Sequence, residues 1–224
     1  MNVDPINSDD ASSDSAWVET SSSGAVAAFG RNVGTSFLLV GGLLSVMWVI
    51  EILDTFALGD RLQGNGILPR STAGLDGVLW SPFLHSGFPH LISNSIPFGV
   101  LSLLILTGGR SRYVKSSIII IVVGGLAVWA FAIGNNENHI GASGWVFGML
   151  GFLLAAAVLE KRPLSILAGF IAIIFYGGTI LVSFVPTAGI SWEGHLFGFI
   201  AGMIAARLTV PKRSLPSLDP PDAG

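Results

Sequence analysis

The residues of this chain that could carry out covalent chemistry occur in three short groups, each at the start of an apolar stretch. They are Gly141-Ala142-Ser143-Gly144, His195, and the pair His90 and Asn94. A serine hydroxyl attacks a carbonyl carbon when a nearby base accepts its proton and donors stabilise the oxyanion. Ser143 can be the nucleophile and His195 the base. His90 and Asn94, one helical turn apart, can supply donors together with the Ser143 backbone N–H. The pattern predicts the chemistry of a serine hydrolase.

The composition places this chemistry inside a membrane. The 224 residues are 51% hydrophobic and 11% charged, with a mean hydropathy of +0.71. These values exclude an ordinary water-soluble domain of this length and predict an integral membrane protein. The absence of cysteine excludes disulfides, thiolate metal sites and a cysteine nucleophile. The net charge of -3 gives no indication of a nucleic-acid partner, and nothing in the sequence implies a metal or organic cofactor.

Six apolar segments are each about long enough to cross a bilayer as a helix. They lie at about 36–55, 90–108, 114–134, 142–159, 164–185 and 193–210. We therefore predict an all-α membrane protein with one domain of six transmembrane helices over residues 36–210. Residues 1–35, rich in Ser, Asp and Ala, and the proline-rich residues 211–224 are predicted to be disordered cytoplasmic tails. The N-terminal stretch lacks the pattern of a cleaved signal peptide.

The basic residues predict the orientation of these helices. Arg61 and Arg70 fall on one side of the membrane, and the other nine lysines and arginines fall on the opposite side. Because basic residues accumulate on the cytoplasmic side, both termini are expected in the cytoplasm, most simply at the cell membrane. The connection at about 56–89 is then a long outer loop between helices 1 and 2. Its segment from Leu79 to Leu84 is expected to lie in the membrane interface, where tryptophan is favoured.

The three polar groups are predicted to lie at one depth. Ser143 precedes the charged residue Glu160 by 17 residues, and His195 precedes Lys212 by the same number. Asn94 precedes Arg110 by 16 residues. At 1.5 Å per residue, each distance is about 25 Å, slightly less than the roughly 30 Å hydrocarbon core. The three groups should therefore meet a little below the outer membrane surface.

Glycine spacing predicts that two of these helices approach closely. Gly194, Gly198 and Gly202 recur every four residues, as do Gly144 and Gly148, a pattern that brings membrane helices together. Phe147 lies one turn after Ser143 and could pack on the His195 ring. Glu193 is too close in sequence to His195 to orient it. We therefore expect a Ser-His dyad in place of a triad.

Taken together, these motifs resemble those of the rhomboid intramembrane serine proteases. Gly141-Ala142-Ser143-Gly144 is similar to that family's Gly-x-Ser-Gly, and His195 with Gly198 and Gly202 is similar to its His-x-x-Gly-x-x-x-Gly. His85, His90 and Asn94 match the family's positions at the start of the second helix. The resemblance covers about 36–210 and implies a rhomboid-like bundle.

By this resemblance Ser143 is the nucleophile and His195 the base, and His90 and Asn94 help form the oxyanion hole beside Gly141. Phe147 stands where the family often has an aromatic residue against the histidine. The expected activity is endopeptidase cleavage of transmembrane protein substrates near the outer membrane face. The sequence does not determine the natural substrate, the oligomeric state or the helices that admit substrate.

One position departs from the family pattern, and several residues keep more than one interpretation. Many members carry Trp-Arg in the outer loop, whereas Trp80 is followed here by Ser81, which leaves the anchoring of the loop open. His85 could line the site or brace the outer loop. His139 is interpreted as an interfacial or capping residue. Asn94 could be an interhelical hydrogen bond without a chemical role.

Three other functions remain as alternatives. A zinc site built from His85, His90 and His195 lacks a His-Glu-x-x-His motif and would leave the serine without a role. A transporter or channel would usually carry its polar groups near the bilayer midplane. The stronger alternative is a catalytically silent rhomboid-like protein that binds transmembrane helices, although such proteins commonly lack the serine or the histidine present here.

Overall fold

The computed structural model describes residues 33–133, 138–186 and 191–210, and these residues are helical apart from turns and one isolated β-bridge. The predicted tails lie almost entirely outside the described residues. The chain divides into two compact units, Met1–Leu39 and Val40–Gly224. Every residue of the candidate site belongs to the second unit.

Among the described residues, short π-helical segments end one long helix and interrupt another, and the 3-10 turns lie in the connection at 59–87. The long helices are Val33–Leu58, which ends in the π-turn η1 (Asp54–Leu58), α3 (Phe88–Leu106), α4 (Arg110–Ile119) continued by η5 (Ile120–Gly124) and α5 (Gly125–Phe131), α6 (Ser143–Glu160), α7 (Pro163–Ser183) and α8 (Trp192–Thr209). Residues 59–87 form the short helices η2 (Leu62–Asn65), η3 (Thr72–Gly74), α2 (Gly77–Trp80) and η4 (Ser81–Phe83).

Four of the described helices are long and apolar enough to cross a membrane. They are Val33–Leu58, Phe88–Leu106, Arg110–Phe131 and Ser143–Glu160. The all-helical membrane class is therefore confirmed, whereas the count of six spans stays a prediction. The third helix begins at Arg110, four residues before the predicted 114. Gly109, with a φ of 103°, marks the start of this helix, and the charged residues that follow Gly109 form its first turn.

The helices that carry the candidate site begin with residues suited to that place. Gly87 has a φ of 92° and is followed by Phe88-Pro89, and proline is favoured in the first helical turn. The Ser191 side chain caps α8 by accepting a hydrogen bond from the Gly194 N–H, with Glu193 in the first turn. These local signals fix where α3 and α8 start.

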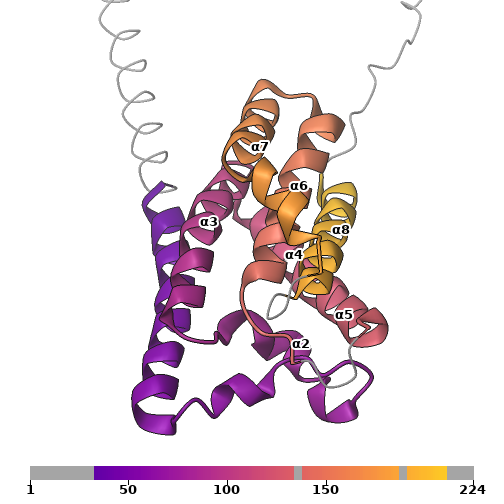
Figure 1. Ribbon diagram of the computed structural model, residues 1–224. Coiled ribbons are helices and arrows are strands. Elements are labelled where there is room, and N and C mark those ends of the chain that lie inside the picture. Colours follow the sequence, from indigo (N-terminus) through magenta and orange to yellow (C-terminus); the bar gives the residue numbers. More distant parts are fainter. Residues whose placement is uncertain (1–32, 134–137, 187–190, 211–224) are drawn as a thin grey trace, which may run out of the picture. The chain divides into compact units, whose positions relative to one another are not determined.

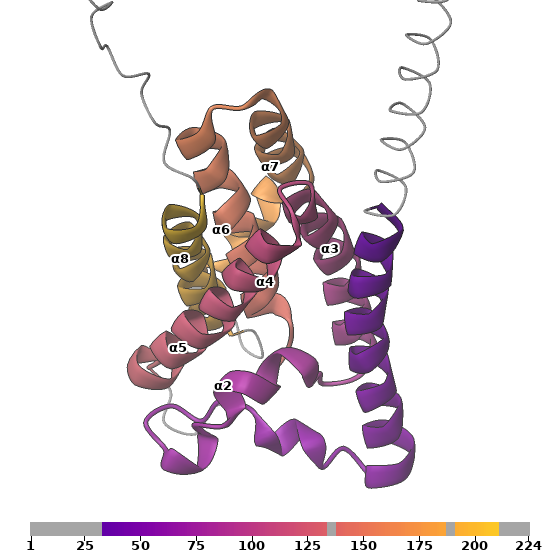
Figure 2. The same cartoon turned by 180° about the vertical axis from the view of Figure 1, so that it is seen from behind.

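Helix α6 lies between α7 and α8 (Figure 1), and in the view from behind α4 and α5 pass across α6 and α8 (Figure 2). Ten residues of α6 are buried, which is consistent with this central position. The starts of α3, α6 and α8 lie at the same end as the 59–87 connection. The bundle therefore brings the three polar groups to one end.

The 59–87 connection has a buried side and an exposed side. Val78, Ser81 and Pro82 are buried, whereas Leu79 and Trp80 are 55% and 57% exposed. In an aqueous loop such apolar exposure would be unfavourable, but the membrane interface accommodates it. The exposed Leu79 and Trp80 side chains are consistent with the interfacial position predicted for this segment.

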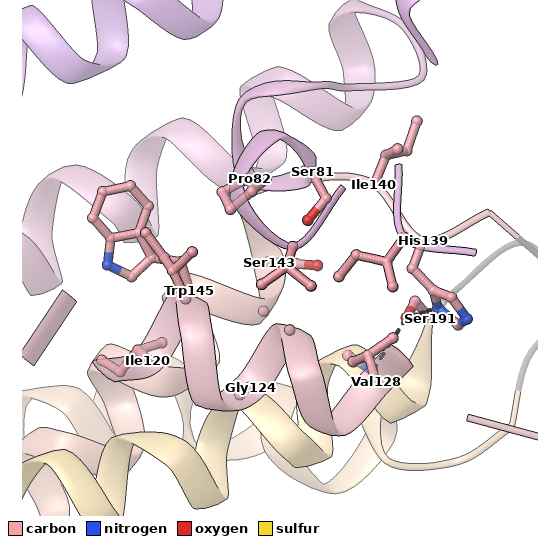
Figure 3. A pocket seen from close by; sticks show the side chains of 18 residues that line it. Ser81, Pro82, Ile120, Gly124, Val128, His139, Ile140, Ser143, Trp145 and Ser191 are labelled. Carbon is pink, nitrogen blue, oxygen red and sulfur yellow. Dashed lines mark hydrogen bonds between the residues drawn. The ribbon is translucent and has the colours of Figure 1, made fainter. Parts of the chain in front are cut away.

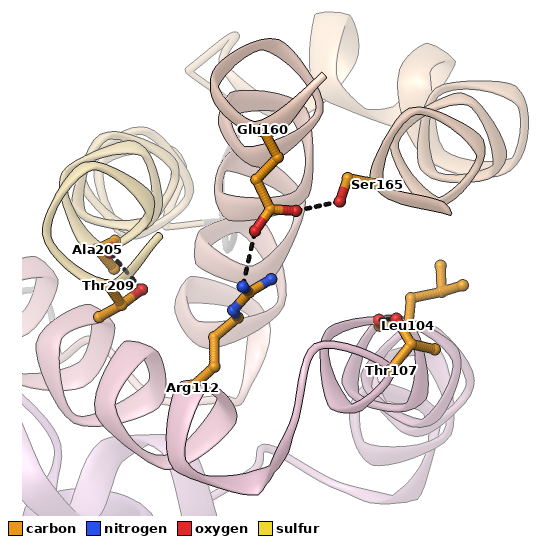
Figure 4. A network of polar contacts seen from close by, with 7 residues as sticks. All are labelled: Leu104, Thr107, Arg112, Glu160, Ser165, Ala205 and Thr209. Atoms are coloured by element: carbon orange, nitrogen blue, oxygen red, sulfur yellow. Dashed lines mark hydrogen bonds and ion pairs between the residues drawn. The ribbon is translucent and has the colours of Figure 1, made fainter. Parts of the chain in front are cut away.

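The opposite end of the bundle is joined by a separate polar network (Figure 4). Arg112 of α4 forms an ion pair with Glu160 of α6 at 2.7 Å, and Ser165 of α7 donates a hydrogen bond to the same carboxylate. The Glu160 side chain is 3% exposed. Three helices therefore share one buried carboxylate at the end remote from Ser143.

Candidate active site

Helices α6 and α8 meet through their glycines at the level of Ser143 and His195. A Cβ atom added at Gly144 would lie 3.3 Å from the Gly194 carbonyl oxygen. One added at Gly198 would lie 2.1 Å from the Gly144 carbonyl oxygen, closer than any real Cβ contact. The two backbones approach each other because neither carries a side chain there, as the glycine spacing predicted.

His195 is held by one ring contact and one hydrogen bond. Its ring stacks on Phe147 with centroids 4.3 Å apart and an interplanar angle of 18°. Its Nδ1 lies 3.1 Å from the carbonyl oxygen of Ser183 at the end of α7. Because a carbonyl only accepts, Nδ1 carries the proton and Nε2 keeps its lone pair. The contact predicted between Phe147 and His195 is present.

Ser143 is the first residue of α6 and is half-buried. Its side chain borders a cavity of about 50 Å³ that extends between α6, α8, η5 and the 59–87 connection. Figure 3 shows the Ser81 and Ser143 hydroxyls toward its middle, with His139 and Ser191 together at the end away from Trp145. Among the described residues, no hydrogen bond joins Ser143 to the His195 ring. Catalytic hydrogen bonds are often formed only once substrate is bound.

His90 and Asn94 converge on Gly141, two residues before Ser143. A Cβ atom added at Gly141 would lie 2.7 Å from His90 Nε2 and 3.5 Å from Asn94 Nδ2. Gly141 also has a φ of 111°, which side chains disfavour, so glycine is required there for two reasons. Asn94 is 6% exposed, and within the described part of the chain its Nδ2 has no hydrogen-bond partner. A buried donor without an acceptor is costly, so this amide calls for an explanation such as a role in catalysis.

The neighbouring serine determines which His90 nitrogen can donate. The Ser86 backbone N–H points at His90 Nδ1 at 3.4 Å, and the Ser86 hydroxyl lies 3.1 Å from the same atom. A nitrogen that accepts from a backbone N–H carries no proton, so the His90 proton is on Nε2. That nitrogen faces Gly141. His90 is therefore placed as a donor at the same point as Asn94.

His85 braces the segment that leads to Ser143. The Ala142 backbone N–H donates to His85 Nε2 at 3.3 Å, and the His85 ring contacts the His90 ring edge-on, with centroids 5.2 Å apart. Burial, with a smaller contribution from His90, lowers the pKa of His85 to about 4. Neutral His85 can accept this bond at ordinary pH. His85 therefore connects the outer loop to the segment before Ser143.

The 59–87 connection is fastened to the same segment by backbone hydrogen bonds. The Gly141 N–H donates to the Ser81 carbonyl at 2.9 Å. Ile67 and His139 form an antiparallel bridge through two bonds of 3.0 Å. No alternating pattern in the sequence predicts this single bridge between Ile67 and His139. The connection thus fixes the backbone on both sides of Ile140.

Arg70 and Trp129 anchor this connection to the end of α5. The Trp129 indole donates to the Ser71 carbonyl at 2.8 Å, and the Arg70 backbone N–H donates to the Trp129 carbonyl at the same distance. The Arg70 guanidinium donates to the Ala132 carbonyl, where α5 has ended. The loop has Trp80-Ser81 where many family members have Trp-Arg. Here a tryptophan and an arginine from two different segments, Trp129 and Arg70, attach the loop to α5.

His139 and Glu193 occupy positions whose partners the sequence did not reveal. His139 Nδ1 lies 2.6 Å from the Ser191 hydroxyl, so His139 contacts the cap residue of α8. Glu193 is 4% exposed and accepts a hydrogen bond from the Ile133 N–H at 3.4 Å, away from His195 as expected. Within residues 33–133, 138–186 and 191–210, no three His, Asp or Glu side chains are grouped as metal ligands.

Comparison with known proteins identifies the family. The model of the Rhomboid domain matches residues 75–212. A protein of Mycobacterium tuberculosis, named only as uncharacterized, is 38% identical over 83% of this chain and 79% of its own length. A protein of Acanthamoeba polyphaga mimivirus named "Putative rhomboid protein" is 31% identical over 59% of this chain and 75% of its own.

A further relative carries a name that states an activity. The "Putative rhomboid protease" of Bacillus subtilis is 27% identical over 58% of this chain and 65% of its own length. The family match spans the helices that carry Ser143, His195, His90 and Asn94. The predicted resemblance is confirmed, and the chain is an integral membrane protein that belongs to the rhomboid family.

Proposed function

We propose that this protein is an intramembrane serine endopeptidase that hydrolyses peptide bonds of transmembrane substrates near the outer membrane face. The observation that carries the proposal is the convergence of three separate segments between Gly141 and Gly144. The start of α3 supplies two donors directed at Gly141, α8 packs its glycines against Gly144, and Ser143 lies between them. This arrangement suits acyl transfer, which needs a nucleophile, a base and an oxyanion site.

The first step is attack of Ser143 Oγ on the scissile carbonyl carbon. His195 Nε2 accepts the hydroxyl proton, because its Nδ1 proton is already donated to the Ser183 carbonyl. Stacking on Phe147 limits rotation of the ring. The group that orients the base is thus a neutral carbonyl, which supports a Ser-His dyad.

The oxyanion that forms needs donors that are in place before the reaction. His90 Nε2–H and Asn94 Nδ2–H both lie beside Gly141, and the Ser143 N–H is adjacent. Donors fixed in a site that excludes water stabilise developing charge strongly, and removing one commonly lowers the rate about 10²- to 10³-fold. The unpartnered Asn94 amide would gain its acceptor in this state.

The intermediate then collapses in two stages. His195 returns the proton to the leaving amine as the C–N bond breaks, which leaves an ester between the substrate acyl group and Ser143. A water molecule gives a proton to His195 and attacks the ester, and Ser143 regains its hydrogen as the acid product leaves. No step requires a metal or an organic cofactor.

The substrate class follows from the position of the site in the bilayer. Ser143 begins a membrane-crossing helix at the end where the 59–87 connection lies, and that connection exposes Leu79 and Trp80. With both termini in the cytoplasm, this end faces outward. A substrate helix must unwind locally to present its peptide bond, so small or helix-breaking residues near the cut are favoured.

Labelling with a fluorophosphonate probe tests the proposal. The purified full-length protein in detergent is expected to react, and Ser143→Ala and His195→Ala are expected to lose the reaction. Ser165→Ala is the matched control, because it also removes a serine hydroxyl, one that donates to Glu160 at the opposite end of the bundle. It should label at the rate of the unmodified protein.

Two results would contradict the proposal. Folded protein that does not react would favour the catalytically silent relative that binds transmembrane helices. Labelling that persists in Ser143→Ala would place the nucleophile elsewhere. Cleavage of a single-span membrane substrate, mapped by mass spectrometry of its fragments, then locates the cut relative to the outer membrane face.

A further inference from the structure

A hydrogen bond links the two segments that lead to Ser143 and His195. His139 Nδ1 lies 2.6 Å from Ser191 Oγ, and both residues border the cavity beside Ser143 (Figure 3). Each partner precedes its catalytic candidate by four residues in the sequence, so the bond joins equivalent points of the two segments. His139 is 5% exposed, and its bond is therefore shielded from competition with water.

Each partner is firmly attached to its own segment. Ser191 accepts the Gly194 N–H at 3.1 Å, and its carbonyl accepts the His195 N–H at 3.2 Å, so it is part of the first turn of α8. His139 is held by its two backbone bonds to Ile67. Because both partners are fixed in this way, the hydrogen bond between them restrains the start of α8 relative to the segment before Ser143.

We propose that His139 and Ser191 are a positioning pair that sets the place of His195 relative to Ser143. The inference rests on the proposed function, and neither residue reacts with substrate. The glycine contact between α6 and α8 sets how closely the two backbones approach. A directional hydrogen bond between the segments that lead into these helices adds a restraint on their relative position.

The size of the effect follows from the geometric demands of proton transfer. The His195 ring must reach the Ser143 hydroxyl within about 3 Å, and a displacement of 1 Å can lower a rate about 10²-fold. The stacked Phe147 belongs to α6, so a shift of α8 would also disturb the ring stacking. Loss of the pair should lower the reactivity of Ser143 more than it lowers stability.

Ser191 also has a simple structural role as the cap of α8, and the variants must separate the two roles. His139→Leu removes the link and leaves the Ser191 cap on Gly194 in place. His139→Asn keeps a polar atom near the position of Nδ1 and should restore the link. Ser191→Ala removes both the cap and the link.

The test measures the fluorophosphonate labelling rate of each full-length variant in detergent, with its unfolding temperature. We expect His139→Leu to label about 10-fold more slowly than the unmodified protein, and His139→Asn to recover most of the rate. The double variant His139→Leu with Ser191→Ala should label no more slowly than Ser191→Ala alone, because one link is lost only once. Ser165→Ala, which breaks a serine bond between α6 and α7, should keep the full rate.

The outcomes separate this inference from the proposed function. Labelling that depends on Ser143 but is unchanged in His139→Leu overturns the positioning pair and leaves the protease proposal intact. Effects of the two single variants that multiply in the double variant also overturn it, because the residues would then act independently. Unmodified protein that shows no Ser143-dependent labelling overturns both.

Discussion

Two contacts hold the segment around Ser143, and they use different physical means. On one side α8 packs against α6 through Gly144, Gly198 and Gly202, with backbone against backbone. On the other side the 59–87 connection is attached by single hydrogen bonds, among them those from Gly141 to Ser81 and from Ala142 to His85. The first contact is steric and continuous, and the second is a set of separate bonds.

The difference determines how each contact tolerates change. A glycine contact has no side chain that could move aside, so any addition displaces a helix. A hydrogen bond can be lost singly at a cost of about 1 kcal/mol, more where a buried group remains unpaired. The helix side should therefore fail abruptly on substitution and the loop side gradually. This contrast fits the proposed function, because the proposed base His195 lies on the helix side, and the 59–87 connection lines the cavity beside Ser143.

Gly198→Ala should have the largest effect of the changes considered. Its new Cβ would lie 2.1 Å from the Gly144 carbonyl oxygen and 3.1 Å from the Gly144 Cα, all backbone atoms. The helices must separate, which we expect to cost about 3 kcal/mol or more and to abolish labelling of Ser143. Thermal unfolding in detergent and fluorophosphonate labelling measure the two losses. A variant as stable and reactive as the unmodified protein would show that the contact is not steric.

Glu160→Ala should destabilise the bundle without affecting the site. The carboxylate pairs with Arg112 and accepts a bond from Ser165 at the end remote from Ser143. Removing one partner of a buried ion pair leaves the other uncompensated, and we expect a loss of about 2 kcal/mol. The labelling rate of the folded variant should be unchanged. A parallel fall in labelling rate would mean that the two ends of α6 are coupled, against the view that local contacts position Ser143.

The sequence predicted the site better than it predicted what supports the site. Motif order and residue depth placed His90 and Asn94 with Gly141, and Phe147 against His195, and the structure has these contacts. Helical periodicity places His90 with Asn94 on one face and Ser143 with Phe147 on another, and the common depth of the helix starts then brings these faces together. The helix bounds differed by a few residues, since polar first turns such as that after Gly109 are not distinguished from loops by hydropathy.

The supporting contacts could not be predicted because they join distant and irregular segments. The bond between Trp129 and Ser71 spans 58 residues, and that between His139 and Ser191 spans 52. The bridge between Ile67 and His139 is a single pair and has no alternating pattern that would indicate a strand. Irregular backbone depends on tertiary contacts, which one sequence does not display.

The loop side can be weakened gradually by pH. Burial lowers the pKa of His85 to about 4, whereas its pKa in the unfolded chain is about 6.5. Between these values the unfolded state binds more protons than the folded state, so this residue makes stability fall as the pH falls from 6.5 toward 4. We expect a slope of about 1 kcal/mol per pH unit from this group, measured by unfolding in detergent at a series of pH values.

His85→Leu isolates this contribution from those of the other histidines. The variant loses the acceptor for the Ala142 N–H and should be less stable at neutral pH. Its stability should nevertheless depend less on pH in the same window than that of the unmodified protein. Equal slopes for the two proteins would mean that His85 titrates normally in the fold and is not buried as the structure has it.

Gly124→Ala should have the smallest effect on stability, and it is the control for Gly198→Ala. Gly124 faces Gly198 from η5, and its added Cβ would lie 3.4 Å from the Gly198 Cα and 3.5 Å from the Ala201 Cβ, which is ordinary van der Waals contact. We expect a change in unfolding free energy within about 0.5 kcal/mol. Gly124→Ala and Gly198→Ala thus add the same methyl group to two contacts of α8, the first with η5 and the second with α6. If both destabilised the protein equally, the failure of Gly198→Ala would reflect the loss of a glycine in general, and the close approach of α6 and α8 would not be its cause.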